Sequence, residues 1–300
     1  MNTAPLEQNL TCPICAAEQS RPIPFRDPDS GLRVLKSAGY HWRLCGNCGN
    51  AFPTQTVSLA ELQQYWDRNR VIEDTPAADT ETVWQSRWQA SQIWAQRTYD
   101  FLAPFWRPDM RRFLDVACGL GATVALFRDK GWQAEGVDAD PNTRQFHEKA
   151  GIAVTIGQVE NLQPGAAFDV ISIAHAIYFV SRPRQFVQRV AAMLKPDGLF
   201  AVIVSDLLSS LSDSCPGYAH TWYPSADALV YLLQQEGFVV IARRSMKGSI
   251  MILAKRGQAA APRAFPRRDY WLHMSQAWRF KLLGRPYRCL VNRLKKLLRK

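Results

Sequence analysis

The sequence RFLDVACGLG, residues 112–121, is an apolar run that ends in a carboxylate and leads into two glycines one residue apart. A helix-like segment follows at residues 122–130, and a second short apolar run ends in Asp138, 17 residues after Gly121. This order is typical of a strand, a tight glycine turn, a helix and a second strand. Such a turn lets the backbone approach a ligand closely, and the second carboxylate can accept hydrogen bonds from ribose hydroxyls.

Apolar and amphipathic runs alternate over residues 111–256. We expect strands at 113–116, 134–137, 153–156, 168–174, 199–204, 238–242 and 250–254, and helices near 122–130, 141–150, 183–194 and 225–236. This alternation predicts an α/β fold, a doubly wound and mostly parallel sheet with helices on both faces. The last two strands are joined only by a short turn and should pair antiparallel.

The residues at the predicted strand ends indicate the kind of ligand, because ligands bind beyond the carboxyl ends of the strands in such a sheet. Asp138 is placed to bind a ribose, and Gln158 with the amide of Val159 is placed to read an adenine edge. Asp115, beside the glycine turn, suits a ligand with an ammonium group and is a poor neighbour for a pyrophosphate. The third glycine of a dinucleotide pattern would fall at Val124. A nucleoside that carries an amino acid is therefore favoured over NAD.

Two Cys-x-x-Cys pairs stand in the first 55 residues, Cys12 with Cys15 and Cys45 with Cys48. Each pair makes a turn that directs two thiolates to one point, and two such turns complete a tetrahedral zinc site. In a cytoplasmic chain such pairs more often hold a metal than form disulfides. We predict a zinc-binding module over residues 1–55 with a closed, structural site; a redox pair or plain buried cysteines are the alternatives. The 29 residues between the pairs should loop out as a hairpin.

Residues 56–110 are predicted to form a helical connector rich in tryptophan, with a gap at residues 75–79. The residues at helical spacing are Leu59, Leu62, Tyr65 and Trp66, then Trp84, Trp88, Ile93 or Trp94, Thr98, and Phe101 or Leu102. An aromatic stripe of this kind is typical of packing on one face of the sheet that follows. The alternative is a lid over a ligand.

The net charge of +11 is concentrated in a basic amphipathic tail, predicted over residues 257–300. Residues 255–300 hold 14 Lys or Arg and one acid, whereas residues 1–254 carry a net charge of −2. Two faces are apolar: one has Trp271, Met274 or Ser275, Trp278 and Leu282, and the other has Leu290, Leu294 and Leu298. Such helices suit an anionic membrane surface or RNA phosphates, and a solvated end docked on the body is the third possibility. The regular leucines favour the membrane.

The N-terminal residues, 1–11, have neither the basic start nor the apolar segment of a secretory signal. The longest nearly uncharged apolar run, residues 170–180, is too short to span a bilayer. We expect a cytoplasmic protein that contacts the inner membrane surface through its tail.

The motif LDVACGLG at residues 114–121 resembles the first motif of class I S-adenosylmethionine-dependent methyltransferases. The segments FDVIS at 168–172, LKPDGL at 194–199 and EGF at 236–238 are similar to later motifs of the family. With its two Cys-x-x-Cys pairs, the chain resembles bacterial methyltransferases that have an N-terminal zinc-binding module, many of which belong to sugar and surface-glycan pathways. The resemblance covers residues 10–256 and is specific for the cofactor.

The resemblance implies a seven-strand sheet of order 3-2-1-4-5-7-6, with the seventh strand antiparallel, and S-adenosylmethionine as the cofactor. The positions that it implies for cofactor binding are Asp115, Ala117, Gly119, Gly121, Asp138, Ala139, Gln158 and Val159. Ala117 stands where the family usually has its first glycine, and we expect its small methyl group to be tolerated.

Methyl transfer requires a nucleophile in line with the sulfonium methyl, and a hydroxyl acceptor must also lose a proton. His175, at the end of the fourth strand, is the first candidate base and His220 the second, with Tyr178 as an orienting group. Each histidine could instead be a packed residue that shapes the pocket. Many relatives have His-x-x-Glu-His after the fourth strand, whereas residues 175–179 read HAIYF, so a mechanism that uses that Glu and second His is not carried over.

The sequence thus predicts a zinc-bearing enzyme that transfers a methyl group from S-adenosylmethionine to a small molecule or a lipid-carrier-linked sugar of a surface-glycan pathway. Two alternatives stay open. One is an RNA methyltransferase that holds nucleic acid with its zinc module and tail, and the other is a non-catalytic cofactor-binding scaffold.

Overall fold

The computed structural model describes residues 10–23, 42–55, 58–67, 80–158, 165, 168–207, 220–246, 248–258 and 260–279. The chain divides into two compact units, each made of separate stretches. Unit 1 takes in Met1–Thr56, Ser205–Tyr231 and Arg263–Lys300, and unit 2 takes in Val57–Val204 and Leu232–Pro262.

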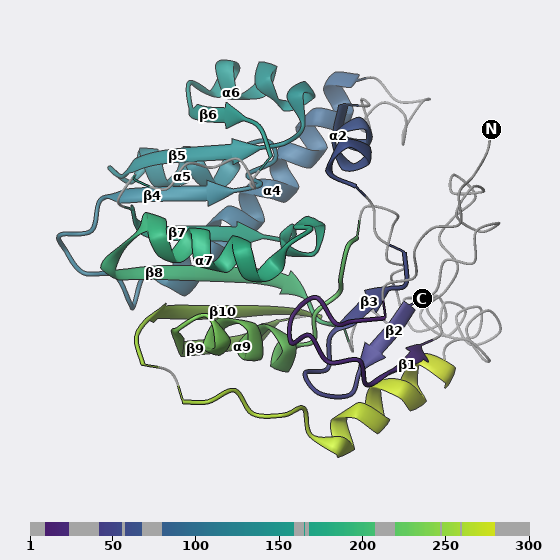
Figure 1. Ribbon diagram of the computed structural model, residues 1–300. Coiled ribbons are helices and arrows are strands. Elements are labelled where there is room, and N and C mark those ends of the chain that lie inside the picture. The colour runs from purple at the N-terminus through teal and green to yellow at the C-terminus, as the bar shows by residue number, and fades with distance from the viewer. Residues whose placement is uncertain are drawn as a thin grey trace, which may run out of the picture. The chain divides into compact units, whose positions relative to one another are not determined.

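A seven-stranded sheet of order β6-β5-β4-β7-β8-β10-β9 forms the centre of unit 2 (Figure 1). Its strands are β4 Arg112–Val116, β5 Gln133–Asp138, β6 Ala153–Ile156, β7 Phe168–Ala174, β8 Leu194–Ser205, β9 Phe238–Met246 and β10 Ser249–Arg256. The pairs β6–β5, β5–β4, β4–β7 and β7–β8 are parallel, and β10 pairs antiparallel with β9. In chain order this is 3-2-1-4-5-7-6, so the predicted fold class, strand order and antiparallel strand are confirmed.

Helices follow the strands as the alternation predicts. They are α5 Ala122–Asp129, α6 Arg144–Ala150 behind the short 3-10 helix η2 Pro141–Thr143, α7 Pro183–Met193 behind η4 Ile177–Phe179, and α9 Ala226–Gln235. Two boundaries differ from the prediction by more than two residues. Strand β8 begins at Leu194 rather than at 199, because Leu194 already pairs with Phe168 of β7 ahead of an irregularity in the register, and β9 ends at Met246 rather than at 242. In the view of Figure 1, α7 lies in front of the sheet and α4 lies behind it.

Two helices precede the sheet, α2 Leu59–Asp67 and α4 Thr80–Leu102. Helix α2 begins with a capping box, in which the Ser58 hydroxyl accepts the Glu61 amide at 3.2 Å and the Glu61 carboxylate accepts the Ser58 amide at 2.8 Å. The C-terminal part of α4 supplies Phe101 and Leu102 to the sheet core. Ile93 is exposed, so Trp94 rather than Ile93 belongs to the apolar face of α4.

One part of the core of unit 2 lies between the sheet and the helices α4 and α5. Its buried residues are Phe101, Leu102, Met110, Phe113, Phe127, Trp132, Val170, Leu199, Ala201, Ile203, Met251 and Leu253. The rings of Phe113 in β4 and Phe127 in α5 stack with centroids 3.7 Å apart. Strand β7 is buried over six consecutive residues, which is typical of a central parallel strand covered on both faces.

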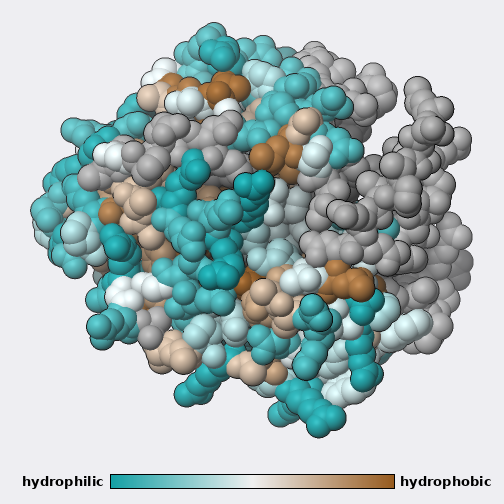
Figure 2. All heavy atoms as spheres, viewed as in Figure 1, coloured by the Kyte–Doolittle hydropathy of each residue, from teal (hydrophilic) through white to brown (hydrophobic). Residues whose placement is uncertain are grey.

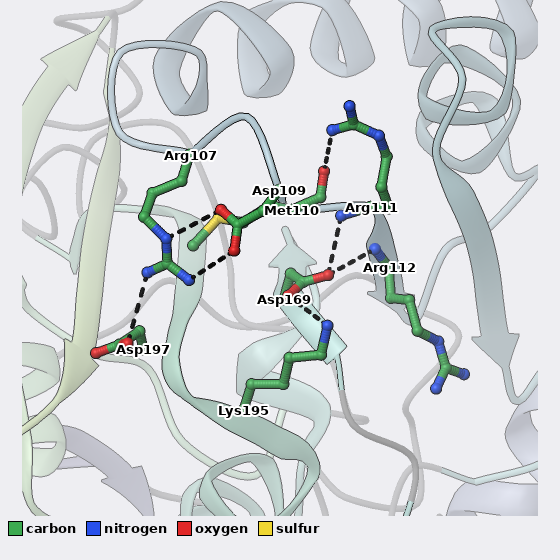
Figure 3. A network of polar contacts seen from close by, with 8 residues as sticks. All are labelled: Arg107, Asp109, Met110, Arg111, Arg112, Asp169, Lys195 and Asp197. Carbon is green, nitrogen blue, oxygen red and sulfur yellow. Dashed lines mark hydrogen bonds and ion pairs between the residues drawn. The ribbon is translucent and has the colours of Figure 1, made fainter.

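A polar network ties together the starts of three strands (Figure 3). The Asp169 carboxylate of β7 accepts the amides of Arg111 and Arg112 at 2.9 Å each, and it accepts the Lys195 ammonium of β8 at 2.7 Å. Burial alone would raise the pKa of Asp169, but the Lys195 ammonium and the two amides hold it below its usual range. Asp169 is therefore an ionised, structural carboxylate on the side of the sheet opposite the strand carboxyl ends.

Unit 1 contains a small antiparallel sheet of β1 Ser20–Ile23, β2 Trp42–Cys45 and β3 Ala51–Pro53. The pairing of β1 with β2 agrees with the hairpin expected between the cysteine pairs, and the connecting residues 24–41 lie outside the described residues. Ala51 and Tyr223 exchange backbone hydrogen bonds of 3.0 and 2.6 Å, which adds the segment around 223 to this sheet.

A helix over residues 267–279, drawn in yellow in Figure 1, ends the described part of unit 1. Trp271, Ser275 and Trp278 are exposed in it while Met274 is buried, so Ser275 rather than Met274 shares the face of the two tryptophans. Val159 and the leucines at 290, 294 and 298 lie outside the described residues.

Among the described helices, none has the length and apolar character needed to cross a membrane. On the face shown in Figure 2, hydrophilic residues predominate and hydrophobic residues gather in separate patches.

Candidate functional site

A cavity of about 520 Å³ lies in unit 2 at the carboxyl ends of β4, β5 and β7. This volume falls within the range of about 300–1,000 Å³ that is usual for small-molecule sites. Strand ends form its floor, and residues of α2 and α4 form a wall that includes Trp66, Trp84 and Arg87. The N-terminal half of the tryptophan-rich connector thus lines a cavity, while its C-terminal half packs on the sheet.

The glycine turn after β4 presents bare backbone to this cavity. Gly119 lines the cavity with a left-handed φ of 56°, and a Cβ added there would meet no atom within 4 Å. Gly121 is left-handed as well, with φ 83°, but a Cβ there would overlap the Ile152 side chain. The first glycine therefore leaves room for a ligand, and the second allows close packing of the turn on its neighbours.

Ala117 lines the cavity with φ 53°, a conformation that residues with a Cβ rarely adopt. A left-handed backbone costs a residue with a side chain about 1–2 kcal/mol. The methyl group at this position is accommodated in the fold, and the strain lies in the wall of the cavity.

Asp138, at the end of β5, is buried and lines the cavity. One carboxylate oxygen accepts the Gly119 amide at 2.6 Å, and the other accepts the Asp140 amide at 2.9 Å. Each oxygen keeps a further lone pair for a hydroxyl donor. Burial raises the pKa of Asp138 to about 6, so the carboxylate is ionised at neutral pH.

Asp115, at the end of β4, is buried and accepts the Ser172 hydroxyl of β7 at 2.5 Å. Burial raises its pKa to about 7. Asp115 and Gly121 are not among the described residues that line the cavity. The side chain of Asp115 therefore links β4 to β7 under the turn, and its contact with an ammonium group stays a prediction.

Gln158 and Ala139 line the cavity and also hold helix α2 in place. The Gln158 amide donates to the Leu59 carbonyl at 3.1 Å and to Gln63 Oε1 at 2.9 Å. Gln63 in turn donates to the Ala139 carbonyl at 3.4 Å. The amide group of Gln158 already donates hydrogen bonds to α2. Only its Oε1 atom is therefore left for the predicted contact with an adenine edge.

His175 follows β7 and lines the cavity with a left-handed φ of 53°. Its Nε2 atom is buried and has no hydrogen-bond partner among the described residues. The Trp94 ring meets the imidazole edge to face at 4.4 Å. Burial lowers the pKa of His175, so the ring is neutral at pH 7 and Nε2 can accept a proton when the Nδ1 tautomer is present.

The other two predicted catalytic residues lie elsewhere. Tyr178 is buried beside the Phe179 ring, and Phe179 rather than Tyr178 is among the described residues of the cavity wall. His220 belongs to unit 1, where its ring stacks on Tyr223 with centroids 5.7 Å apart. Their roles in catalysis stay predictions.

His147 of α6 is a residue of the site that the sequence patterns did not indicate. Its Nε2 donates to the Gly119 carbonyl at 2.8 Å, and its ring is buried against the glycine turn. Burial lowers the pKa of His147, so the ring is neutral at pH 7. His147 is therefore a positioning residue that holds the glycine turn in place through the Gly119 carbonyl.

Comparison with known proteins identifies the family. Residues 87–243, just over half of the chain, match the model of a family described as a methyltransferase domain. The chain belongs to this family. The match begins in α4 and takes in the whole described cavity wall except the residues of α2 and Trp84.

Two curated methyltransferases are similar in sequence. Malonyl-[acyl-carrier protein] O-methyltransferase of Porphyromonas gingivalis is 25% identical over 182 residues, which cover 56% of this chain and 70% of that protein. Ubiquinone biosynthesis O-methyltransferase of Nitrobacter winogradskyi is 33% identical over 96 residues, which cover 30% of this chain and 37% of that protein.

The fold is also that of solved methyltransferases. Magnesium protoporphyrin IX methyltransferase from Synechocystis PCC 6803, solved with bound SAH, superposes with a TM-score of 0.50 at 13% identity over 67% of this chain and 100% of its own. Family and fold together identify an S-adenosylmethionine-dependent methyltransferase with a Rossmann-like domain.

The cavity of this methyltransferase fits the cofactor. Open space above Gly119 leaves room for the ligand beside bare backbone, and the free lone pairs of Asp138 face the cavity. When bound, S-adenosylmethionine supplies an activated methyl group. The residues at the ends of β4 and β5 would hold the nucleoside, and the end of β7 with His175 would be left for an acceptor.

A second candidate site of the methyltransferase is the cluster of Cys12, Cys15, Cys45 and Cys48, whose Sγ atoms all lie within 4.8 Å of one another. The Sγ atoms of Cys12 and Cys48 are 3.6 Å apart, and those of Cys15 and Cys45 are 3.5 Å apart. Tetrahedral coordination at a Zn–S distance of about 2.3 Å requires sulfurs about 3.8 Å apart. The cluster therefore has the geometry of a four-thiolate metal site.

The two turns of the cysteine cluster have the same backbone form. The amide of Ala16 donates to the Cys12 carbonyl at 3.0 Å, and the amide of Gly49 donates to the Cys45 carbonyl at 3.1 Å. Both donors are left-handed, with φ 57° and 75°. Hydrogen bonds among the thiols raise the pKa of Cys12 and lower that of Cys15, which shows how closely the four groups interact.

Proposed function

We propose that this methyltransferase transfers a methyl group to a hydroxyl oxygen of a small or carrier-linked acceptor, a sugar of a surface-glycan pathway. The observation that carries the proposal is the Nε2 atom of His175, which is buried at the cavity and has no partner among the described residues. A neutral imidazole in this place can accept the proton of a hydroxyl that approaches the methyl group. The two similar curated proteins are both named as O-methyltransferases.

The surroundings of His175 prepare it for this role. Its left-handed backbone, fixed by a hydrogen bond of 2.7 Å from its amide to the Ile203 carbonyl, directs the ring from the end of β7. Trp94 packs against the ring and limits its rotation. Strain of this kind persists where the surrounding structure enforces it and is common at functional sites.

Arg87 supports an acceptor with an anionic group. It is the one Lys or Arg among the described residues of the cavity wall, where its backbone carbonyl accepts the Ser91 hydroxyl and its guanidinium makes no hydrogen bond or ion pair with the described residues. Trp66 and Trp84 line the same cavity and offer apolar surface. A sugar on a phosphate-bearing lipid carrier or nucleotide offers both an anion and an apolar or aromatic group. The Porphyromonas gingivalis relative is itself named for a carrier-linked acceptor.

The cysteine cluster holds a structural zinc ion in this proposal. Four thiolates leave no open coordination position, so the metal would stabilise unit 1 and take no part in methyl transfer. The sugar class of the acceptor rests on the resemblance of the combined zinc module and methyltransferase domain to enzymes of glycan pathways.

The test is to supply methyl-labelled S-adenosylmethionine to a lysate with the purified enzyme and to separate lipid, glycan, nucleotide-sugar and RNA fractions. We expect label in a sugar of the lipid-linked or nucleotide-linked fraction. His175→Gln should lower kcat by about 100-fold or more, the usual contribution of a general base, without changing the Kd for S-adenosylhomocysteine. Label confined to RNA, or full activity of His175→Gln, would contradict the proposal.

The anion is tested separately with Arg87→Gln. If Arg87 binds the acceptor, the KM for the labelled fraction should rise about tenfold or more, as expected for the loss of one charged hydrogen bond, while the Kd for S-adenosylhomocysteine stays the same. Arg144→Gln, at an exposed position of α6 outside the cavity wall, is the matched control. A weaker Kd for the nucleoside in Arg87→Gln would assign the arginine to the cofactor instead.

A further inference from the structure

The helix over residues 267–279 of unit 1 has one buried face and one exposed apolar face. Tyr270, His273, Met274 and Ala277 are buried. Outside this buried face, Trp271 and Trp278 share one flank of the helix, seven residues apart, and are 48% and 45% exposed, while Leu272, farther round the helix, is 47% exposed. These are three of the six large hydrophobic residues that are exposed in the described part of the chain. The apolar groups of this face are therefore not required to fill the core of unit 1.

The helix is fixed to the cysteine turns, so its exposed face has a defined orientation on unit 1. The amide of Phe265 donates to the Asn47 carbonyl at 2.7 Å, between Cys45 and Cys48. The Phe265 ring lies so close to Gly49 that a Cβ on the glycine would come within 2.7 Å of it. The ring also meets His273 at 5.3 Å. The buried side of the helix therefore holds it on unit 1, independently of any binding partner.

Basic side chains lie beside and between these exposed apolar residues. Arg267, Arg268 and Arg279 are exposed on the same helix, and the Arg21 guanidinium lies 5.5 Å from the centre of the Trp271 ring. The acid of this helix, Asp269, is half-buried, and its backbone carbonyl accepts a hydrogen bond from His273. The face therefore combines apolar rings with an excess of positive charge.

We propose that this face, with Trp271, Leu272 and Trp278 between arginines, docks the enzyme on the surface of an anionic lipid bilayer. Tryptophan and leucine on one side of a helix can enter the boundary between head groups and acyl chains, while arginines at its edges meet anionic head groups. Arginine stems lie along apolar surface while their charges stay in water. Nucleic acid would match the arginines but offers no apolar environment to Leu272. The surface belongs to unit 1 and does not depend on the acceptor proposed above.

The test is flotation of the full chain with vesicles of phosphatidylcholine alone and of phosphatidylcholine mixed with phosphatidylglycerol. We expect binding only to the mixed vesicles, and less binding as salt is raised. The double variant Trp271→Ser with Trp278→Ser should bind the mixed vesicles at least tenfold more weakly. Ile93→Ser is the matched control, because Ile93 is 54% exposed on α4 of unit 2, and it should bind like the wild type.

Three outcomes would overturn the proposal. The double variant could bind as well as the wild type, which would assign the binding to charge elsewhere in the tail. Binding could be equal for both vesicle types, or the protein could bind a single-stranded RNA oligonucleotide and no vesicle. Because both tryptophans are half-exposed, the double variant should keep the wild-type melting temperature, so that a loss of vesicle binding can be separated from unfolding.

Discussion

Two residues of the cavity wall, Ala117 and His175, have the left-handed backbone that is easy for glycine and costly for other residues. Among the described residues, only Ala16 of the first cysteine turn is a further non-glycine residue of this kind. Within the described part of the chain, left-handed backbone in non-glycine residues thus occurs at the two candidate sites. The sequence indicated the position of Ala117, because a glycine is usual there, but it gave no sign of the conformation of His175.

Ala117→Gly should stabilise the protein. Glycine removes the left-handed cost at this position, and the gain should be about 1 kcal/mol after its larger loss of chain entropy, equivalent to a rise of about 2–4 °C in melting temperature. Ala125→Gly, inside helix α5, is the control and should lower the melting temperature by a similar amount. If the melting temperature falls for both variants, the backbone of Ala117 is not strained.

Cofactor binding should weaken in acid through Asp138. The pKa of this carboxyl is raised to about 6, so it is ionised above that pH and can accept hydroxyl donors with both oxygens. Below about pH 6 it gains a proton, and the Kd for S-adenosylhomocysteine should rise by about tenfold per pH unit if only the ionised form binds. Calorimetry from pH 8 to pH 5 measures this.

The control for that titration is Asp138→Asn, which should bind S-adenosylhomocysteine weakly and with a Kd that does not depend on pH. The same titration of His147→Gln separates the positioning residue from the carboxylate. It should weaken binding at every pH, because the Gly119 carbonyl loses part of its support, while leaving the acid limb in place. A flat profile for the wild type would rule out the ribose role of Asp138.

At the scale of elements, apolar periodicity was sufficient to predict every strand of the seven-stranded sheet, whereas the order of the strands was predicted from the resemblance to the methyltransferase family. Continuous apolar runs such as residues 168–174 mark central strands, and the Ser58–Glu61 capping box marks the start of α2. The packing of α2 on Gln158 could not be predicted, because it depends on hydrogen bonds between residues about 95–99 positions apart. The same holds for His147, whose place on α6 has no signal in the local pattern.

The Asp169 network should contribute strongly to the stability of the sheet. Asp169→Ala leaves the amides of Arg111 and Arg112 without an acceptor, and the free energy of unfolding should fall by about 2–4 kcal/mol. Asp197→Ala, an exposed acid of the same network, should change it by about 0.5 kcal/mol or less. Urea titrations of both variants measure this.

The stabilisation by Asp169 should also depend on pH. The pKa of Asp169 is lowered in the folded chain, so its contribution is present above the unfolded value of about 3.9 and is lost as pH falls through the folded value. The difference in unfolding free energy between wild type and Asp169→Ala should therefore be constant from pH 8 to pH 5 and shrink below about pH 4. A difference that shrank at neutral pH instead would point to another group.

At the scale of the whole molecule, the cavity wall lies within unit 2, whereas the cysteine cluster lies within unit 1. Composition and spacing suggested four consecutive segments, at 1–55, 56–110, 111–256 and 257–300. Such a description follows the order of the chain, and it cannot reveal that the segment around Tyr223 and residues 263–279 belong to the same unit as the N-terminal cysteines. Those contacts, such as Ala51 with Tyr223 and Asn47 with Phe265, join residues far apart in sequence.

Metal removal should affect unit 1 selectively. The purified protein should contain one zinc ion per chain, and a strong chelator should lower its melting temperature while the Kd for S-adenosylhomocysteine changes by no more than about threefold. Cys45→Ser should lose the zinc, and Cys118→Ser, outside the cluster, should keep it. If neither the wild type nor Cys118→Ser contains zinc, or if chelation abolishes nucleoside binding, this division of roles is wrong.

The discontinuity of unit 1 has a consequence for biosynthesis. Its cysteines leave the ribosome first, but the segment around Tyr223 is made only after five strands of the seven-stranded sheet, and the helix over residues 267–279 is made only after the whole sheet has been translated. The nascent cysteine turns must therefore wait, with Gly49 uncovered by Phe265, until translation has passed residue 265. A polypeptide released early could carry a folded sheet and still expose the surface on which that helix belongs, which would mark it for quality control by chaperones and proteases.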